Sequence, residues 1–98
     1  MLGEALETYT RLRPREVLLV RVEISGVSEE VLVFRGASSS LTSPTPLDPG
    51  QPVIPPGARL LNVDRLKAPY VPNDPQVIAT GLEQDQLERL LAEENIVL

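Results

Sequence analysis

Two residue types that often carry chemistry are missing from this chain, which has no cysteine and no histidine. The absence of cysteine excludes disulfides, thiolate metal sites and a thiol nucleophile. The absence of histidine excludes imidazole acid–base chemistry and histidine-ligated zinc. We therefore expect no cofactor and no metal site, and we predict that the chain is not an enzyme.

Aromatic residues and positive charge are also scarce. The 98 residues include no tryptophan, and Phe34, Tyr9 and Tyr70 are the aromatic residues, so the core must be aliphatic. A net charge of −5 disfavours general attraction to nucleic acid or to an anionic membrane. The chain has no apolar run of about 18 residues, the length that predicts a membrane-spanning helix, and its start does not resemble a signal peptide. These features predict a small soluble domain, cytoplasmic, that spans residues 1–98.

Proline, in contrast, is abundant and regularly spaced. It recurs every third residue at Pro46, Pro49, Pro52 and Pro55, and again at Pro69, Pro72 and Pro75. Three residues make one turn of polyproline II helix, so each series predicts a stiff, extended connection. We expect a Pro/Ser-rich loop over residues 37–57, in which Val53 and Ile54 form either an anchor into the core or a two-residue strand. A loop of this length is usually functional or disordered, and the density of proline favours a stiff segment over a flexible one.

Helical spacing of apolar residues appears at both ends of the chain. Leu2, Leu6 and Tyr9 predict a short amphipathic helix over residues 2–12, which Pro14 would stop. Near the other end, Thr80 and Glu83 match a capping box, with Thr80 as the N-cap. We therefore predict a second helix over residues 81–94.

The middle of the chain has the alternation that is typical of strands. Residues 16–24 and 29–36 flank a Ser-Gly turn and predict an antiparallel hairpin over 16–36. Residues 58–80 predict two further strands, at 58–66 and around 77–79, joined by the second proline series. The resulting fold is α+β: a small, mostly antiparallel sheet of three to five strands with the C-terminal helix packed on it. A small open β-barrel is the alternative.

A cluster of arginines precedes and enters the first predicted strand. Arg11, Arg13, Arg15 and Arg21 are candidates for binding an anion. An RNA- or phosphate-binding domain is therefore an alternative function. The sequence places no aromatic residue beside these arginines on which a base could stack, which weighs against nucleic acid.

Stiff proline-rich segments favour a different function, which is contact with a protein partner. The candidate contact residues are Pro49, Pro52, Arg65, Tyr70 and Asn73, because proline supplies rigid surface and tyrosine and arginine are frequent interface anchors. We predict a non-enzymatic protein-interaction module, such as an accessory subunit or assembly factor, or a homo-oligomer. A small enzyme built on Asp64, Lys67 and Tyr70 is a third interpretation, and it would need a deep pocket that holds all three.

Two stretches carry a resemblance. VLLVRVEISGVSEEVLVFRG and IPPGARLLNVDRLKAPYVPNDPQVIATGL, within residues 15–82, resemble small uncharacterised proteins of cyanobacteria and plastids. The resemblance implies a setting in the cytoplasm or the plastid stroma, beside photosynthetic or gene-expression machinery. It implies no catalytic residues.

Overall fold

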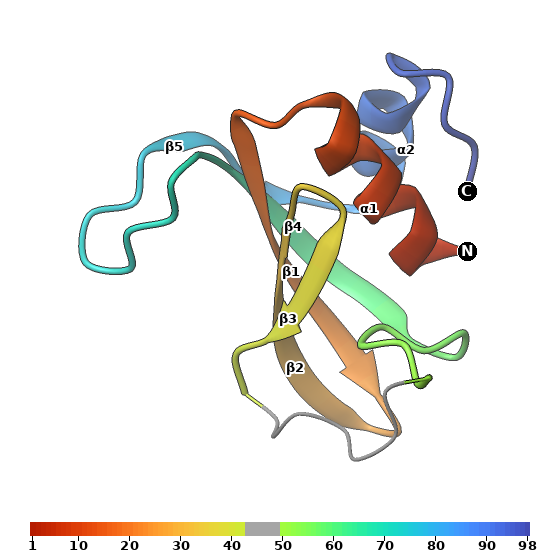
Figure 1. Ribbon diagram of the computed structural model, residues 1–98. Coiled ribbons are helices and arrows are strands. Elements are labelled where there is room, and N and C mark those ends of the chain that lie inside the picture. The colour runs from red at the N-terminus through yellow and green to blue at the C-terminus, as the bar shows by residue number, and fades with distance from the viewer. Residues whose placement is uncertain (43–49) are drawn as a thin grey trace.

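A five-stranded antiparallel sheet with both helices on one face forms the protein (Figure 1). The computed structural model describes residues 1–42 and 50–98. In chain order the elements are α1 (Leu2–Leu12), β1 (Glu16–Ile24), β2 (Val27–Phe34), β3 (Ala37–Ser40), β4 (Arg59–Lys67), β5 (Val77–Leu82) and α2 (Gln84–Ala92). The strands lie in the order β3-β2-β1-β4-β5. The α+β prediction is confirmed, and the sheet is open rather than closed into a barrel.

The core lies between the sheet and the two helices. Strand β1 is central, and its alternate residues Leu18, Val20 and Val22 are buried completely on the helix side. Helix α1 has the predicted bounds and packs Leu6 and Tyr9 against this face. The remaining core residues are Ala5, Val31, Val33, Ile54, Val63, Leu87, Leu90 and Leu91. Period-two alternation in the strands therefore meets helical periodicity across one core, which is aliphatic as predicted except for the fully buried Tyr9.

The start of helix α2 differs from the prediction. The N-cap is Glu83, whose side chain accepts a hydrogen bond from the backbone of Gln86, while the Gln86 side chain binds the backbone N–H of Glu83. Thr80, the predicted N-cap, belongs instead to β5, which continues to Leu82 and pairs there with Val63. Strand pairing with β4 keeps Thr80 in β5, so the helix begins later and Glu83 takes the N-cap position. The helix ends at Ala92 rather than at residue 94.

The sheet also contains a strand that the sequence did not predict. Residues 37–40, expected to begin the long loop, form β3 and pair with β2. A tight turn at Arg35 and Gly36 joins the two strands, and both residues have positive φ angles, 49° and 83°. Such a turn matches the twist of a hairpin, so it can pair a serine-rich segment of weak strand propensity. The expected anchor at Ile54 is confirmed, because its side chain is 2% exposed.

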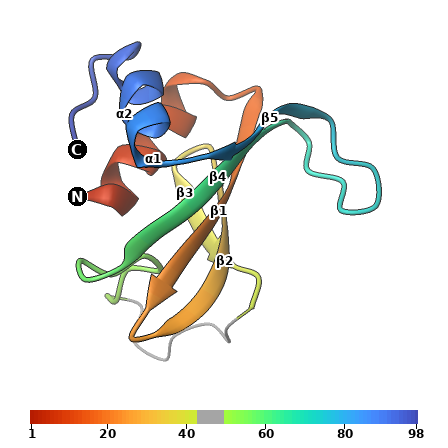
Figure 2. The same ribbon diagram turned by 180° about the vertical axis from the view of Figure 1, so that it is seen from behind.

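The connection between β4 and β5, residues 68–76, projects from the sheet on the side away from the helices (Figure 2). We call this segment the arm. The backbone N–H of Lys67 donates to the carbonyl of Gln76 over 2.8 Å and closes its base. The peptide bond between Ala68 and Pro69 is cis. Of the helices in the described parts of the chain, none is long and apolar enough to cross a membrane.

Candidate functional site

The face of the sheet opposite the helices, here called the open face, carries a row of apolar side chains. Val17 pairs with Leu66, and Leu66 pairs with Val77, so these three residues cross three strands on the same face. Phe34 extends the row on β2, one position beyond the pair of Val33 with Leu18. Val17 and Leu66 are 1% and 3% exposed, yet they lie outside the main core. The apolar row, Phe34, Val17, Leu66 and Val77, is thus a second, smaller hydrophobic cluster.

Polar side chains occupy the next part of the open face. The Arg21 guanidinium lies 3.1 Å from an Asp64 carboxylate oxygen and 3.2 Å from one of Glu30. It also donates to Oδ1 of Asn62 over 2.7 Å. Asp64 in turn accepts a hydrogen bond from the backbone N–H of Gly81. Arg21 is therefore committed to acceptors on the strands at both sides of β1.

The helix-covered face holds a different charged network at its edge. Arg65 donates two hydrogen bonds to the Glu16 carboxylate, each 3.0 Å long. Tyr9 of helix α1 donates its hydroxyl to Glu16 over 2.7 Å. Arg13 donates to the Tyr9 hydroxyl and also to Glu94, just beyond the end of helix α2. A bidentate arginine–carboxylate pair that is mostly buried is a strong contact, so this network ties both helices to the sheet.

Burial and hydrogen bonding change the pKa values of the network. Burial raises the pKa of Tyr9 to about 12, and the hydrogen bond to Glu16 acts in the same direction. Burial alone would raise the pKa of Glu16, but hydrogen bonds from Arg65 and Tyr9 hold it below its usual value. The hydrogen bond to Glu16 raises the pKa of Arg65. All of these groups are therefore in their stabilising protonation states at neutral pH.

The positive charges of the chain fall into two groups. Five of the nine arginine and lysine side chains form ion pairs with carboxylates: Arg13, Arg21, Arg59, Arg65 and Arg89. The other four form no ion pair with any carboxylate of residues 1–42 and 50–98. They are Arg11, Arg15, Arg35 and Lys67, and we call them the basic end.

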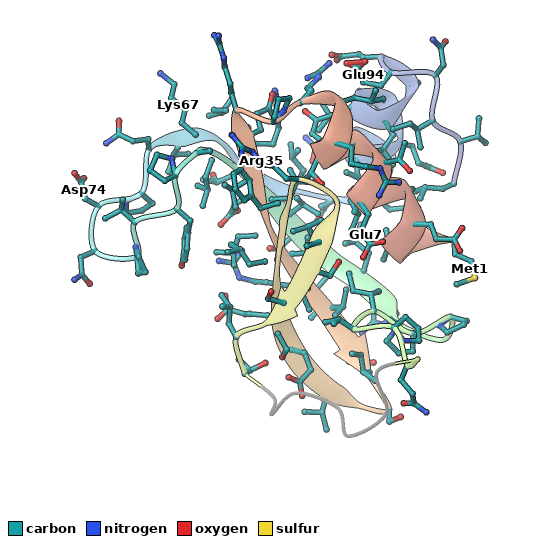
Figure 3. The ribbon with its side chains drawn as sticks, in the orientation of Figure 1. Met1, Glu7, Arg35, Lys67, Asp74 and Glu94 are labelled. Atoms are coloured by element: carbon teal, nitrogen blue, oxygen red, sulfur yellow. The ribbon has the colours of Figure 1, made fainter. Side chains whose placement is uncertain are left out.

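The basic end is gathered by the fold at one end of the sheet. Arg15 lies in the turn before β1, and its carbonyl accepts a hydrogen bond from the backbone N–H of Ala68, next to Lys67. Arg35 lies in the turn between β2 and β3, and the stem of Arg11 packs over Gly36 in the same turn. Figure 3 labels Arg35 and Lys67 at the end of the sheet where the arm begins.

A shallow cleft of about 230 Å³ opens in the basic end. Its walls are Pro14, Arg15, Phe34, Arg35, Ala68 and Pro69. The Arg35 guanidinium lies over the Phe34 ring, with its Cζ 5.1 Å from the ring centroid. The cleft thus combines two cationic side chains with an aromatic ring and apolar walls.

The residues predicted to contact a partner do not form one surface. Tyr70 and Asn73 both lie in the arm, where Asn73 is exposed and Tyr70 is half-buried. Arg65 is held by Glu16 on the helix-covered face. Pro52 lines a separate cleft beside helix α1, together with Glu4 and Glu7. Pro49, like Pro46, lies outside the described residues.

The predicted anion-binding arginines are divided in the same way. Arg13 and Arg21 have carboxylate partners, as described above, whereas Arg11 and Arg15 belong to the basic end. Arg35, Lys67 and Phe34 also lie in this region, and none of them was predicted there from the sequence. The available signal for Arg35 was the glycine that follows it, since glycine after a predicted strand marks a turn. Lys67 joins them only through the pairing of β1 with β4.

The third set, Asp64, Lys67 and Tyr70, is also separated. Asp64 lies on the open face and binds Arg21, and Lys67 is exposed at the base of the arm. Neither cleft described here is lined by any of the three. Within the described parts of the chain, no group of acidic side chains is arranged to hold a metal ion.

Comparison with known proteins places the chain in a family. It matches no curated protein and no solved structure. One family model, described as "Domain of unknown function (DUF7734)", matches residues 3–91, which include every helix and strand from α1 almost to the end of α2. Because the match covers most of the chain, the protein belongs to the DUF7734 family.

Proposed function

We propose that the chain is a non-enzymatic protein-interaction module, an accessory subunit or assembly factor that docks a protein partner on its open face. The observation that carries this proposal is the apolar row on a face without a covering helix. Both helices pack on the opposite face, so a partner is the natural cover for the open one. Val17 and Leu66 are buried, so the accessible part of the row is Val77, which is 52% exposed, together with half-buried Phe34. Accessible apolar surface often marks an interaction site.

The arm extends this surface beyond the sheet. Val71 in the arm and Val77 just after it are 45% and 52% exposed. Tyr70, also in the arm, is a residue type that interfaces favour. A partner with an apolar ridge would contact both the row and the arm. We expect a different protein rather than a second copy, because two copies of a chain with net charge −5 repel each other.

The cellular setting is part of the same proposal. The resemblance over residues 15–82 to small proteins of cyanobacteria and plastids supports the cytoplasm or the plastid stroma. The partner would then belong to a larger assembly in that compartment.

The test compares two pairs of exposed valines. The V71S/V77S variant changes the arm and the open face, and V27S/V97S makes the same chemical change at sites 56% and 89% exposed elsewhere. A partner captured by the wild-type chain is purified, and its affinity for each variant is measured by calorimetry. We expect V71S/V77S to weaken binding about tenfold, as loss of interface contacts does, and V27S/V97S to leave it unchanged.

Two results would count against docking on the open face. One is a partner that binds both variants equally well. The other is a wild-type chain that captures no partner reproducibly and that elutes as a dimer, which would make the second copy the cover.

A further inference from the structure

We propose that the cleft in the basic end binds a nucleotide, with its phosphate between Arg15 and Arg35 and its base on the Phe34 side. The cleft shares Phe34 with the apolar row, but its cationic groups, Arg15 and Arg35, have no part in the docking proposal, so the inference does not depend on that proposal. Four observations carry the inference: the cations without a carboxylate partner in the described residues, the aromatic wall, the size of the cleft and the backbone of Arg35.

The first observation is the distribution of cations. In an acidic chain, carboxylates are plentiful, and five of the nine cations have one within 3.3 Å. Acids near the basic end already have other partners. Glu16 binds Arg65, Glu94 binds Arg13, and Glu7 accepts from the Ser38 hydroxyl. A local concentration of positive charge therefore persists although the net charge is −5, and screening keeps the distant acids from cancelling it.

The second observation is the aromatic wall. The sequence places no aromatic residue beside the arginines, but the sheet brings Phe34 from β2 into the same cleft as Arg15. The Arg35 guanidinium lies over the Phe34 ring and adds a second flat group to this wall. A base can stack on such a surface, and guanidinium groups bind phosphate in a bidentate manner. In the sequence, the lack of an aromatic residue beside the arginines weighed against nucleic acid, and Phe34 supplies that residue in the folded chain.

The third observation is the size of the cleft. Its volume of about 230 Å³ is below the usual range for pockets that enclose drug-sized ligands. It can therefore hold part of one nucleotide but cannot enclose a dinucleotide cofactor. The nucleotide is either free or part of a single strand whose remaining phosphates contact Arg11 and Lys67.

The fourth observation is the backbone at Arg35. Its φ of 49° is uncommon for a residue other than glycine, and asparagine or aspartate tolerates it better. Arginine is therefore not the residue that the turn itself favours. The side chain has a separate use, which we assign to the ligand.

The experiment titrates three probes at low salt: inorganic phosphate, 5′-AMP and a short single-stranded oligouridine. Binding is followed by amide chemical shifts, which also report where each probe contacts the protein. The test variant is R15Q/R35N, because asparagine suits the positive φ of the turn and keeps the fold intact. The matched control is R59Q/R89Q, which removes the same charge from two exposed ion pairs. The S25N variant controls for asparagine at a positive φ in the hairpin turn between β1 and β2.

We expect the shifts to centre on Arg15, Phe34 and Arg35. R15Q/R35N should weaken binding at least about tenfold. For oligouridine, the slope of the logarithm of the binding constant against the logarithm of salt concentration should become shallower by about two. R59Q/R89Q and S25N should bind as the wild type does. The F34L variant keeps an apolar side chain but removes the ring on which a base can stack. It should therefore weaken the binding of 5′-AMP more than the binding of inorganic phosphate. Binding of 5′-AMP identifies a free nucleotide as the ligand, whereas binding of oligouridine alone identifies a single strand.

The proposal is overturned if no probe binds at low salt, or if R59Q/R89Q loses as much affinity as R15Q/R35N. The V71S/V77S variant separates this site from the docking surface. It should bind the probes normally, so failure of one proposal leaves the other intact.

Discussion

The two faces of the sheet are built from the same strands but are stabilised in different ways. On the helix-covered face, Leu18 and Val20 are fully buried in one aliphatic core. On the open face, Leu19 is half-buried, and Arg21 binds carboxylates that remain partly exposed. Neighbouring residues of β1 thus differ in environment because successive side chains point to opposite faces. The helix-covered face therefore holds the main core, whereas the open face combines the buried pair Val17 and Leu66 with side chains that stay partly exposed.

The largest difference in unfolding free energy should appear between the variants Leu18→Ala and Leu19→Ala. Leu18 is fully buried, so its truncation leaves a cavity and should cost about 3 kcal/mol or more of unfolding free energy. Leu19, one residue along, should cost about 1 kcal/mol because it is already partly solvated. Urea denaturation of the two variants measures both values. Equal losses would mean that the open face is as important to the fold as the core.

The loss of unfolding free energy should also differ between two charge variants, Glu16→Gln on the helix-covered face and Glu30→Gln on the open face. The side chains of Glu16 and Arg65 are 13% and 20% exposed, and their bidentate pair leaves Arg65 poorly partnered when the carboxylate is lost. We expect a loss of about 2–3 kcal/mol. Glu30 and Arg21 are 41% and 35% exposed, so Glu30→Gln should cost less than about 1 kcal/mol. A double-mutant cycle with Arg65→Gln would isolate the Glu16 pair, and a coupling energy near zero would contradict the assignment.

The same network should make stability depend on acid pH. The folded-state pKa of Glu16 is lowered, so its contribution is present above the unfolded value of about 4.5 and is lost as the pH falls through the folded pKa. Urea midpoints measured between neutral and acid pH should fall less steeply for Glu16→Gln than for the wild type. Parallel curves for the two proteins would remove Glu16 as a source of acid sensitivity.

Tyr9 should make the stability of the fold depend on alkaline pH as well. Its pKa is raised from 10.0 to about 12, so the stabilisation is present below the unfolded value and is lost as the pH rises from about 10 to about 12. Tyrosinate absorbance in a Tyr70→Phe background would follow Tyr9 alone. A folded-state pKa that stays at the ordinary tyrosine value would show that the hydroxyl is not held by Glu16 as described.

The smallest effect on stability should come from the arm and the edge of the open face. The valines at 71 and 77 are exposed, so V71S/V77S should change the unfolding free energy by about 0.5 kcal/mol or less for each substitution. This result would sharpen the comparison, because a change that weakens binding without affecting stability places the function on the open face. A large loss of stability would instead make the arm a structural element.

Local patterns in the sequence determined much of the fold. Helical spacing predicted the bounds of α1, and alternation predicted the hairpin of β1 and β2, although β2 spans Val27–Phe34 rather than residues 29–36. These patterns depend on residues close in sequence, so they can be interpreted without the rest of the molecule. The same is true of the missing chemistry, since absent histidine and cysteine need no structure to interpret.

Tertiary structure decided where the strands and the charges meet. Strand β3 exists because the Arg35–Gly36 turn returns the chain to β2, and Glu83 caps α2 because β4 extends β5 to Leu82. The partners of the arginines also come from strands and helices that are distant in sequence. Arg13 and Arg15 are two residues apart, yet Arg13 pairs with Glu94 and Arg15 lines the cleft. Contacts between segments far apart in sequence are set by the register of the whole sheet, which single-residue preferences do not determine. The sequence by itself determined the elements and the excluded chemistry, and only the sheet register decided which charges are paired and which remain available at the basic end.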